Sequence, residues 1–189
     1  MEKDNTALLV MDVQNAIVGM LEDKEKLINP LRQTIKEAHQ HEIPVIYITV
    51  GFRKGYPEIS PNNKSFDPIK NSDRNFDTIE AQAVYDEVAP QSGDIVVKKR
   101  RVSAFTGSDL EVVLRSQQIN HLVLAGIATS GVVLSTVREA ADKDYRLTVL
   151  SNCCADRDEE VHRMLINKIF SRQADVMSAG EWRQSLKNN

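Results

Sequence analysis

The sequence of 189 residues is poor in cysteine and in aromatic residues, and it carries little excess charge. Its two cysteines, Cys153 and Cys154, are adjacent, and adjacent cysteines rarely form a disulfide because the bond geometry is strained. A disulfide framework is therefore excluded, and we expect a reducing compartment, the cytoplasm. No apolar run approaches the length that crosses a membrane, and the first residues lack the basic and apolar segments of an export signal.

The formal net charge of -3 argues against a nucleic-acid partner and against a membrane-surface partner, because both require a basic face. The one basic run, VKKRR at residues 97–101, is predicted to be a solvated strand end. Hydrophobic residues make up 41% and charged residues 27% of the chain, which is typical of globular proteins. We expect one domain over residues 1–189.

Apolar segments alternate with helical patterns along the chain. Most of these segments are continuously apolar, which is typical of strands that are covered on both faces in a parallel sheet. One helix is predicted over residues 24–41, where Leu27, Leu31 and Ile35 fall four apart. The alternation predicts an α/β sandwich. The six predicted strands are residues 6–12, 43–50, 93–99, 119–127, 145–152 and 173–179.

Three helix starts carry a Ser or Asp followed three residues later by Glu, which is the pattern of a capping box. The predicted pairs are Ser108 with Glu111, Asp156 with Glu159, and Ser178 with Glu181.

Residues 51–77 break the alternation, because they are rich in Gly, Pro, Asn and Ser and have little periodicity. Loops of this length in compact domains are usually functional or disordered. The segment follows the C-terminal end of a predicted strand, where α/β proteins bind ligands. We therefore favour a loop that covers the substrate over a disordered insertion.

Three weak signals fall at strand ends. Asp12 follows the first strand, Lys99 ends the third, and the turn at residues 126–131 follows the fourth. Taken singly, the first is an ordinary capping residue and the second a surface lysine. Together they would place an acid, a cation and exposed backbone N–H groups at one edge of the sheet.

These residues resemble a known family. The pattern K-x-R-x-S-A-F at residues 99–105 and the sequence GIATSG at residues 126–131 are similar to signatures of the isochorismatase-like hydrolases, which include nicotinamidases and related cysteine amidohydrolases. The resemblance extends over nearly the whole chain. It implies a three-layer α/β/α sandwich with a six-stranded, mainly parallel sheet.

The resemblance also implies roles for individual residues. Asp12 would accept and donate the proton, and Lys99 would steady the charges. Backbone N–H groups of the turn would form an oxyanion hole after a cis peptide bond, which here involves Ile127, Ala128 and Gly131. The family's nucleophilic cysteine follows the last glycine of the turn, and that position holds Val132.

Valine cannot form a thioester, so the cysteine mechanism is closed to this chain. Ser130 remains open as a substitute nucleophile, whereas Cys153 and Cys154 are predicted to be packing residues. Family members without the cysteine act on isochorismate-type enol ethers. Such a substrate can be cleaved by a carboxylic acid that protonates its vinyl carbon, which is a role open to Asp12.

Four further side chains are candidates for contacts with the substrate. Gln14 follows Asp12 closely, Arg53 and Tyr56 open the long loop, and Phe105 ends the lysine motif. Arg53 could grip a carboxylate, although an exposed loop arginine and a core phenylalanine are equally good interpretations. The zinc-binding members carry histidines after the second strand, where this chain has none. We expect no metal and no cofactor.

Three functional hypotheses follow. The first is a small-molecule hydrolase without a covalent cysteine, and the second is an inactive member that binds a small carboxylate or a protein partner. The third, a purely structural protein, has only the missing cysteine in its favour. We favour the first, because a buried acid and lysine add little to stability. The resemblance also favours a homodimer or a larger homo-oligomer.

Overall fold

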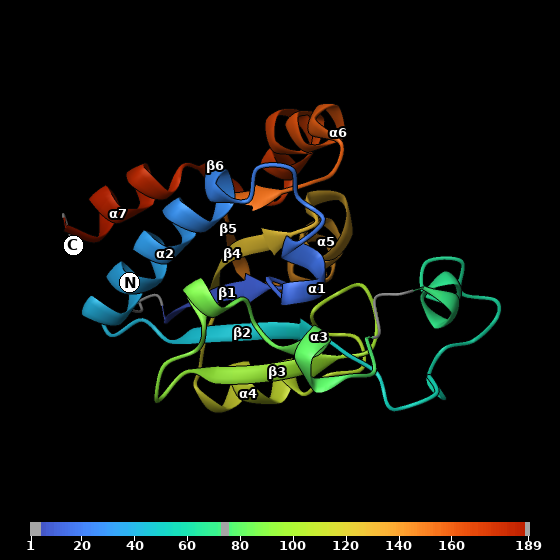
Figure 1. Cartoon of the computed structure of the whole chain (residues 1–189). Coiled ribbons are helices and arrows are strands. Elements are labelled where there is room, and N and C mark those ends of the chain that lie inside the picture. The colour runs from blue at the N-terminus through green and yellow to red at the C-terminus, as the bar shows by residue number, and fades with distance from the viewer. Residues whose placement is uncertain (1–4, 73–75, 188–189) are drawn as a thin grey trace.

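The computed structural model describes residues 5–72 and 76–187 of the chain. Its centre is a six-stranded sheet in the order β3-β2-β1-β4-β5-β6, and every adjacent pair of strands is parallel (Figure 1). The predicted α/β sandwich with a six-stranded sheet is therefore confirmed. The strands are β1 (Thr6–Met11), β2 (Val45–Val50), β3 (Ile95–Lys99), β4 (His121–Ile127), β5 (Arg146–Ala155) and β6 (Asp175–Met177).

Helices cover both faces of the sheet. The α-helices are α1 (Asn15–Val18), α2 (Glu25–Gln40), α3 (Ile79–Gln82), α4 (Leu110–Ser116), α5 (Leu134–Asp142), α6 (Glu159–Met164) and α7 (Ala179–Lys187). Shorter turns of helix are η1 (Asp67–Asn71), η2 (Asp86–Val88), η3 (Thr129–Val133), η4 (Leu165–Ile169) and η5 (Phe170–Arg172). No helix in residues 5–72 and 76–187 is long and apolar enough to cross a bilayer.

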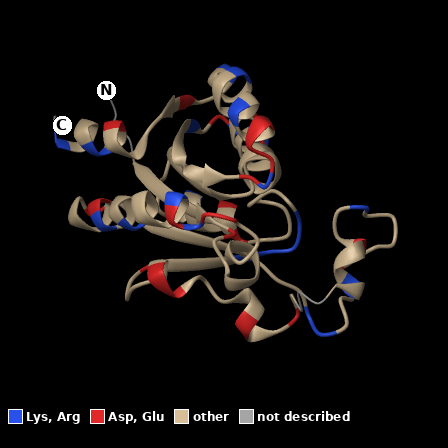
Figure 2. Cartoon of the chain, turned by 45° about the horizontal axis from the view of Figure 1, so that its top comes forward, with Lys and Arg blue, Asp and Glu red and all other residues tan. Residues whose placement is uncertain are grey.

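The central strands β1, β2 and β4 are almost entirely apolar because both of their faces are buried, whereas the edge strands β3 and β6 are partly exposed. Leu8 and Val10 of β1 join the core cluster under α1, α2 and α7, whereas Leu9 and Met11 join the cluster under α4 and α5. Alternate side chains of a strand point to opposite faces, so both cores need apolar residues from the same strand. Charged residues of both signs lie mainly along the covering helices and loops, as Figure 2 shows.

The three predicted capping boxes have different outcomes. Ser178 and Glu181 bond each other's backbone N–H groups at the start of α7, as predicted. The prediction for α6 was wrong by two positions, because the side chain of Asp158 accepts the N–H groups of Glu160 and Val161. Asp156 lies before this cap and is free to bond another segment.

The third prediction was wrong: Ser108 accepts the N–H group of Leu110 rather than that of Glu111, and the carboxylate of Glu111 pairs with Lys143 and Arg115 instead of returning to Ser108.

The long loop at residues 51–77 holds one short helix, η1, in its described part. The segment that carries η1 stands away from the body of the molecule (Figure 1). Its base is anchored by aromatic packing, since the rings of Phe52 and Phe66 lie 5.5 Å apart and those of Phe52 and Tyr56 lie 5.8 Å apart. Phe52 at one end of the loop and Phe76 at the other are both buried in the core cluster under α1, α2 and α7.

The side of the sheet on which the chain adds its strands changes between β1 and β4. From β1 it builds β2 and β3 on one side, and it then crosses to build β4, β5 and β6 on the other. In open α/β sheets the crevice beside such a switch point, at the carboxyl ends of the strands, is where ligands bind. Met11 pairs with Gly126 in this register, so Asp12 and the turn after β4 flank the switch point.

Gly126 permits the close approach of β1 and β4 at this point. Its φ is +148°, and a Cβ there would overlap the carbonyl oxygen of Met11 and lie 2.9 Å from the Met11 Cβ. A side chain would force apart the two strand ends that present Asp12 and the turn.

We expect Gly126→Ala to lower the free energy of unfolding by about 3 kcal/mol, because it adds both strain and overlap. The matched control is Gly55→Ala, where φ is +77° but a Cβ meets no atom within 4 Å. Gly55→Ala should lower the free energy of unfolding only by the backbone strain, about 1 kcal/mol. Urea denaturation of the two variants measures this difference, and equal losses would contradict the proposed close approach.

Candidate active site

Asp12 and Lys99 form a buried ion pair at the carboxyl edge of the sheet. The Nζ atom of Lys99 lies 2.9 Å from Oδ2 of Asp12, and the two residues are 1% and 6% exposed, respectively. Nζ also donates to the carbonyl oxygen of Arg101 at 2.9 Å. Among the described residues, the second carboxylate oxygen, Oδ1 of Asp12, has no hydrogen-bond partner. One oxygen of the carboxyl group is held by Lys99, and the other is buried without a hydrogen bond.

Burial raises the pKa of Asp12 above its ordinary value, and the charge and hydrogen bond of Lys99 act in the opposite direction. Burial is the larger effect, because a carboxylate without water is costly, and it outweighs both Lys99 and a smaller contribution from the backbone of Val50. A carboxyl group with a raised pKa can hold a proton nearer to neutral pH, which suits general acid catalysis.

Gln14 fixes the strand ends beside this pair. Its side-chain Nε2 donates to the carbonyl oxygens of Val50 at 2.9 Å and Gln82 at 3.0 Å, and its Oε1 accepts the N–H of Val50 at 2.8 Å. The residue is fully buried. Gln14 therefore joins the end of β1 to the end of β2, and its contact with a substrate stays a prediction.

The turn after β4 begins with a cis peptide bond between Ile127 and Ala128. The N–H groups of Gly131 and Val133 both donate to the carbonyl oxygen of Ala128, at 3.1 and 3.3 Å. Those two groups are thus used within the turn.

The outer side of the turn is held by the segment before α6. The N–H of Ser130 donates to Oδ2 of Asp156 at 2.7 Å, and the Thr129 hydroxyl lies 2.8 Å from Nδ1 of His162. Ser130 is exposed, whereas Asp12 and Lys99 are buried, so its hydroxyl does not share their environment.

Val132 is 2% exposed and belongs to the apolar cluster that also contains Phe105 and Cys154. The methyl groups of Val132 therefore fill part of this core. The rings of Phe105 and Tyr145 pack against each other with 5.9 Å between their centroids. Burial raises the pKa of the Cys153 thiol to about 11 and that of Cys154 further still. Neither thiol is positioned to replace the missing nucleophile, because a reactive thiol needs a lowered pKa.

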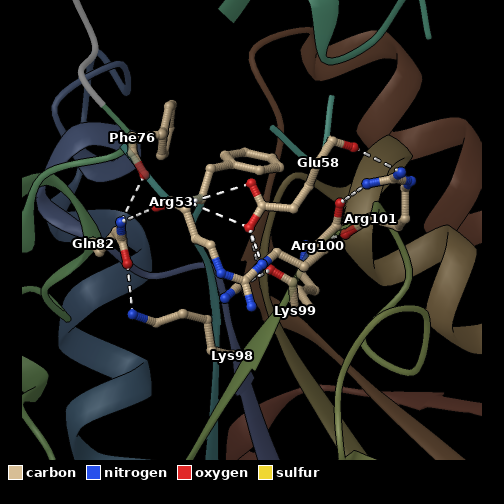
Figure 3. Close-up of polar contacts among 9 residues, drawn as sticks. Arg53, Glu58, Phe76, Gln82, Lys98, Lys99, Arg100 and Arg101 are labelled. Atoms are coloured by element: carbon tan, nitrogen blue, oxygen red, sulfur yellow. Dashed lines mark hydrogen bonds and ion pairs between the residues drawn. The ribbon is translucent and has the colours of Figure 1, made fainter. Parts of the chain in front are cut away.

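The basic run at residues 97–101 is solvated only in part, because Lys98 is exposed whereas Lys99 is buried. Lys98 donates to Oε1 of Gln82 at 2.6 Å and Lys99 is buried at Asp12. Arg100 and Arg101 turn toward the long loop, where both contact Glu58 (Figure 3). Each cation has an acceptor that lies far away in the sequence.

The two loop candidates are also engaged within the protein. The guanidinium group of Arg53 lies 2.6 Å from Oε1 of Glu58, and the hydroxyl of Tyr56 donates to Oδ1 of Asp77 at 3.3 Å. A substrate would have to compete for either group. Glu58, Gln82 and Asp156 hold the site's surroundings together, and sequence analysis assigned none of them to the site.

A cavity of about 740 Å³ lies behind the turn and not at the ion pair. Its lining includes Met20, Asn152, Asp156, Arg157 and His162, and it does not include Asp12, Lys99 or Val132. The candidate site is assigned from the buried charges and the switch point, because volume alone carries no chemistry. No group of three or more potential metal ligands occurs among the described residues.

Comparison with known proteins agrees with this architecture. Residues 6–181 match the isochorismatase domain. The ureidoacrylate amidohydrolase of Stutzerimonas stutzeri is 34% identical over 174 residues, which cover 80% of this chain and 70% of that protein. The maleamate amidohydrolase of Pseudomonas putida is 32% identical over 106 residues, which cover 56% and 50%.

An isochorismatase family protein from Burkholderia thailandensis has the same fold, with a TM-score of 0.88 and 26% identity over 97% of this chain and 96% of that one. The chain belongs to the isochorismatase family of small-molecule hydrolases.

The raised pKa of Asp12 predicts a pH dependence of stability. The unfolded value is 3.8 and the folded value is higher, so the folded chain binds this proton more tightly. The resulting stabilisation is present below pH 4 and is lost as the pH rises through the folded pKa, at most about 1.4 kcal/mol per pH unit.

Urea denaturation of the natural protein and Asp12→Asn between pH 4 and pH 8 tests this expectation. The natural protein should lose stability relative to the variant as the pH rises. A relative gain would mean that Lys99 outweighs burial.

Proposed function

We propose that the protein hydrolyses a small molecule without a covalent intermediate, with Asp12 as the general acid and base and Lys99 as the group that balances its charge. The observation that carries this proposal is the buried carboxyl group with one oxygen held at 2.9 Å by Lys99 and the other unpartnered. Val132 supplies no nucleophile, so water must attack the substrate directly.

The chemistry suits an enol ether of the isochorismate type. Asp12 transfers its proton to the vinyl carbon, and the electron pair of the double bond forms the new C–H bond. Water then adds to the resulting oxocarbenium ion and returns a proton to Asp12. The hemiketal formed in this way separates into a carbonyl compound and an alcohol, and no thiol is needed.

Amides are the second substrate class, favoured by the names of two relatives, a ureidoacrylate and a maleamate amidohydrolase. An amide carbonyl is a poor electrophile for neutral water. With valine at position 132, Asp12 would have to activate that water as a base. We therefore rank enol ethers above amides for this chain.

A binding protein without activity is the alternative, and one observation favours it. Asp12, Lys99 and Val132 are 6%, 1% and 2% exposed, so no ligand can reach them in this conformation. The bound molecule would then be a small carboxylate or a protein partner. Both the hydrolase and the binding protein would be homo-oligomers in the cytoplasm. Exposed apolar residues such as Val96 and Val112 would suit a subunit interface.

We expect Asp12→Asn to lower turnover by at least about 100-fold on any substrate that the natural protein hydrolyses, because the amide neither donates nor accepts the required proton. The panel contains isochorismate, ureidoacrylate and maleamate. Asp144→Asn is the matched control, since Asp144 is exposed and lies on the α5–β5 connection. Undiminished turnover in Asp12→Asn would remove Asp12 from the mechanism.

We expect Val132→Cys to create amidase activity on ureidoacrylate or maleamate, because the thiol would restore the attacking atom at the position where the family carries its cysteine. Val133→Cys, one residue further along the same turn, is the control. Release of ammonia measures the reaction, and iodoacetamide should abolish it. If both variants stay inactive on every amide, the surrounding groups are not arranged for acyl transfer.

A further inference from the structure

Apolar residues at the start of the long loop belong to the core beneath α1, α2 and α7. Phe52, Tyr56 and Ile59 of that loop belong to the same apolar cluster as Val13 and Ile127, which adjoin Asp12 and the turn. We call the described residues 53–72 the covering segment: its first residues belong to this cluster, whereas the part that carries η1 stands away from the body of the molecule (Figure 1).

The two ends of the covering segment are fastened together. The N–H of Phe52 donates to the carbonyl oxygen of Phe76 at 3.1 Å. The side-chain amide of Gln82 donates to both carbonyl oxygens, at 3.1 Å for Phe52 and 2.8 Å for Phe76 (Figure 3). With its ends fixed, the segment can open only between them.

Glu58 is one polar attachment between those ends, beside the hydrogen bonds that Gly55 and Tyr56 donate to Asp77. Its Oε1 lies 2.6 Å from Nη1 of Arg53 and 3.4 Å from Nε of Arg100, and the N–H of Arg53 lies 3.3 Å from both carboxylate oxygens. Figure 3 shows the two guanidinium groups converging on this one carboxylate. Two cations share a single anion, so this place has the composition of an anion site.

Hydrogen bonds connect Glu58 to the ion pair of Asp12 and Lys99. The carbonyl oxygen of Glu58 accepts a hydrogen bond from Nη2 of Arg101 at 3.0 Å, and the carbonyl oxygen of Arg101 accepts one from Nζ of Lys99. Burial acts to raise the pKa of Glu58, but bonds from backbone N–H groups and from Arg53 outweigh it and lower the pKa. Glu58 is thus a carboxylate at neutral pH, as a mimic of a bound anion must be.

We propose that Arg53 and Arg100 form a binding site for a small carboxylate, that Glu58 occupies it while the covering segment is closed, and that an incoming carboxylate exchanges with Glu58 and so releases the segment. The link to turnover rests on the proposed function, because it assumes that release admits the same molecule to Asp12. The exchange itself is a binding event and needs no chemistry.

The exchange is energetically feasible because donors of the same kind serve either carboxylate. Glu58 is tethered, and a short tether gives an effective concentration in the millimolar range. A free carboxylate must compete with it, so the natural protein should bind weakly. Removing the charge of Glu58 should strengthen the binding of the free ligand by about tenfold, because the arginine site is then mostly unoccupied by the side chain at position 58.

The probe is crotonate, which has a carboxylate and no bond for this site to hydrolyse, with crotonamide as its neutral match. Calorimetry with the full chain should show Glu58→Gln binding crotonate about tenfold more tightly than the natural protein, with no such gain for crotonamide. Glu87→Gln is the matched control, because Glu87 also pairs with an arginine, Arg32, elsewhere on the surface. The double variant Arg53→Gln/Arg100→Gln should lose crotonate binding.

Unchanged or weaker crotonate binding by Glu58→Gln would overturn the exchange and leave Glu58 as a structural tie. Glu58→Asp provides a second reading if the glutamine variant does not fold, and it should show an intermediate gain. Hydrogen exchange of residues 53–72 tests release, since crotonate should speed it in the natural protein. Binding without faster exchange would overturn that part. None of these readouts depends on turnover, so failure of the substrate panel remains distinguishable.

Discussion

The buried ion pair between Asp12 and Lys99 is the constraint on which the site depends. Two charges with almost no exposure cost free energy unless each finds a partner, and here they find one another at 2.9 Å. The residues end β1 and β3, which are separated in the sheet by β2. The pair therefore draws together the ends of two non-adjacent strands, and Gln14 ties β1 to β2 on the same edge.

The sheet order explains why this edge is the functional one. The chain leaves β1 in one direction to form β2 and β3 and returns to β4 on the other side, so the loops after β1 and β4 diverge. Asp12 and the turn with its cis bond flank that opening. The loop after β2 then crosses toward the arginines that follow β3, where Glu58 fastens it.

Apolar runs were enough to predict the six strands, because burial of both faces leaves few polar positions in the central strands β1, β2 and β4. Asp12 and Lys99 could be found because each comes at the end of such a run. Glu58 could not, since its partner Arg100 lies 42 positions away in a loop without periodicity. Asp156 was assigned to a cap because local spacing cannot tell which of two nearby aspartates reaches the helix, and it bonds Ser130 instead.

Val132 and the ion pair have different physical explanations. The valine side chain lies in the apolar cluster with Phe105 and Cys154, where its volume alone accounts for its presence. No such account serves Asp12 and Lys99, because apolar residues of similar volume would fill the same space at equal or greater stability. A purely packed or inactive edge would need neither charge. The unpartnered Asp12 oxygen, held in a closed space where water cannot compete, is what proton transfer to a bound substrate requires.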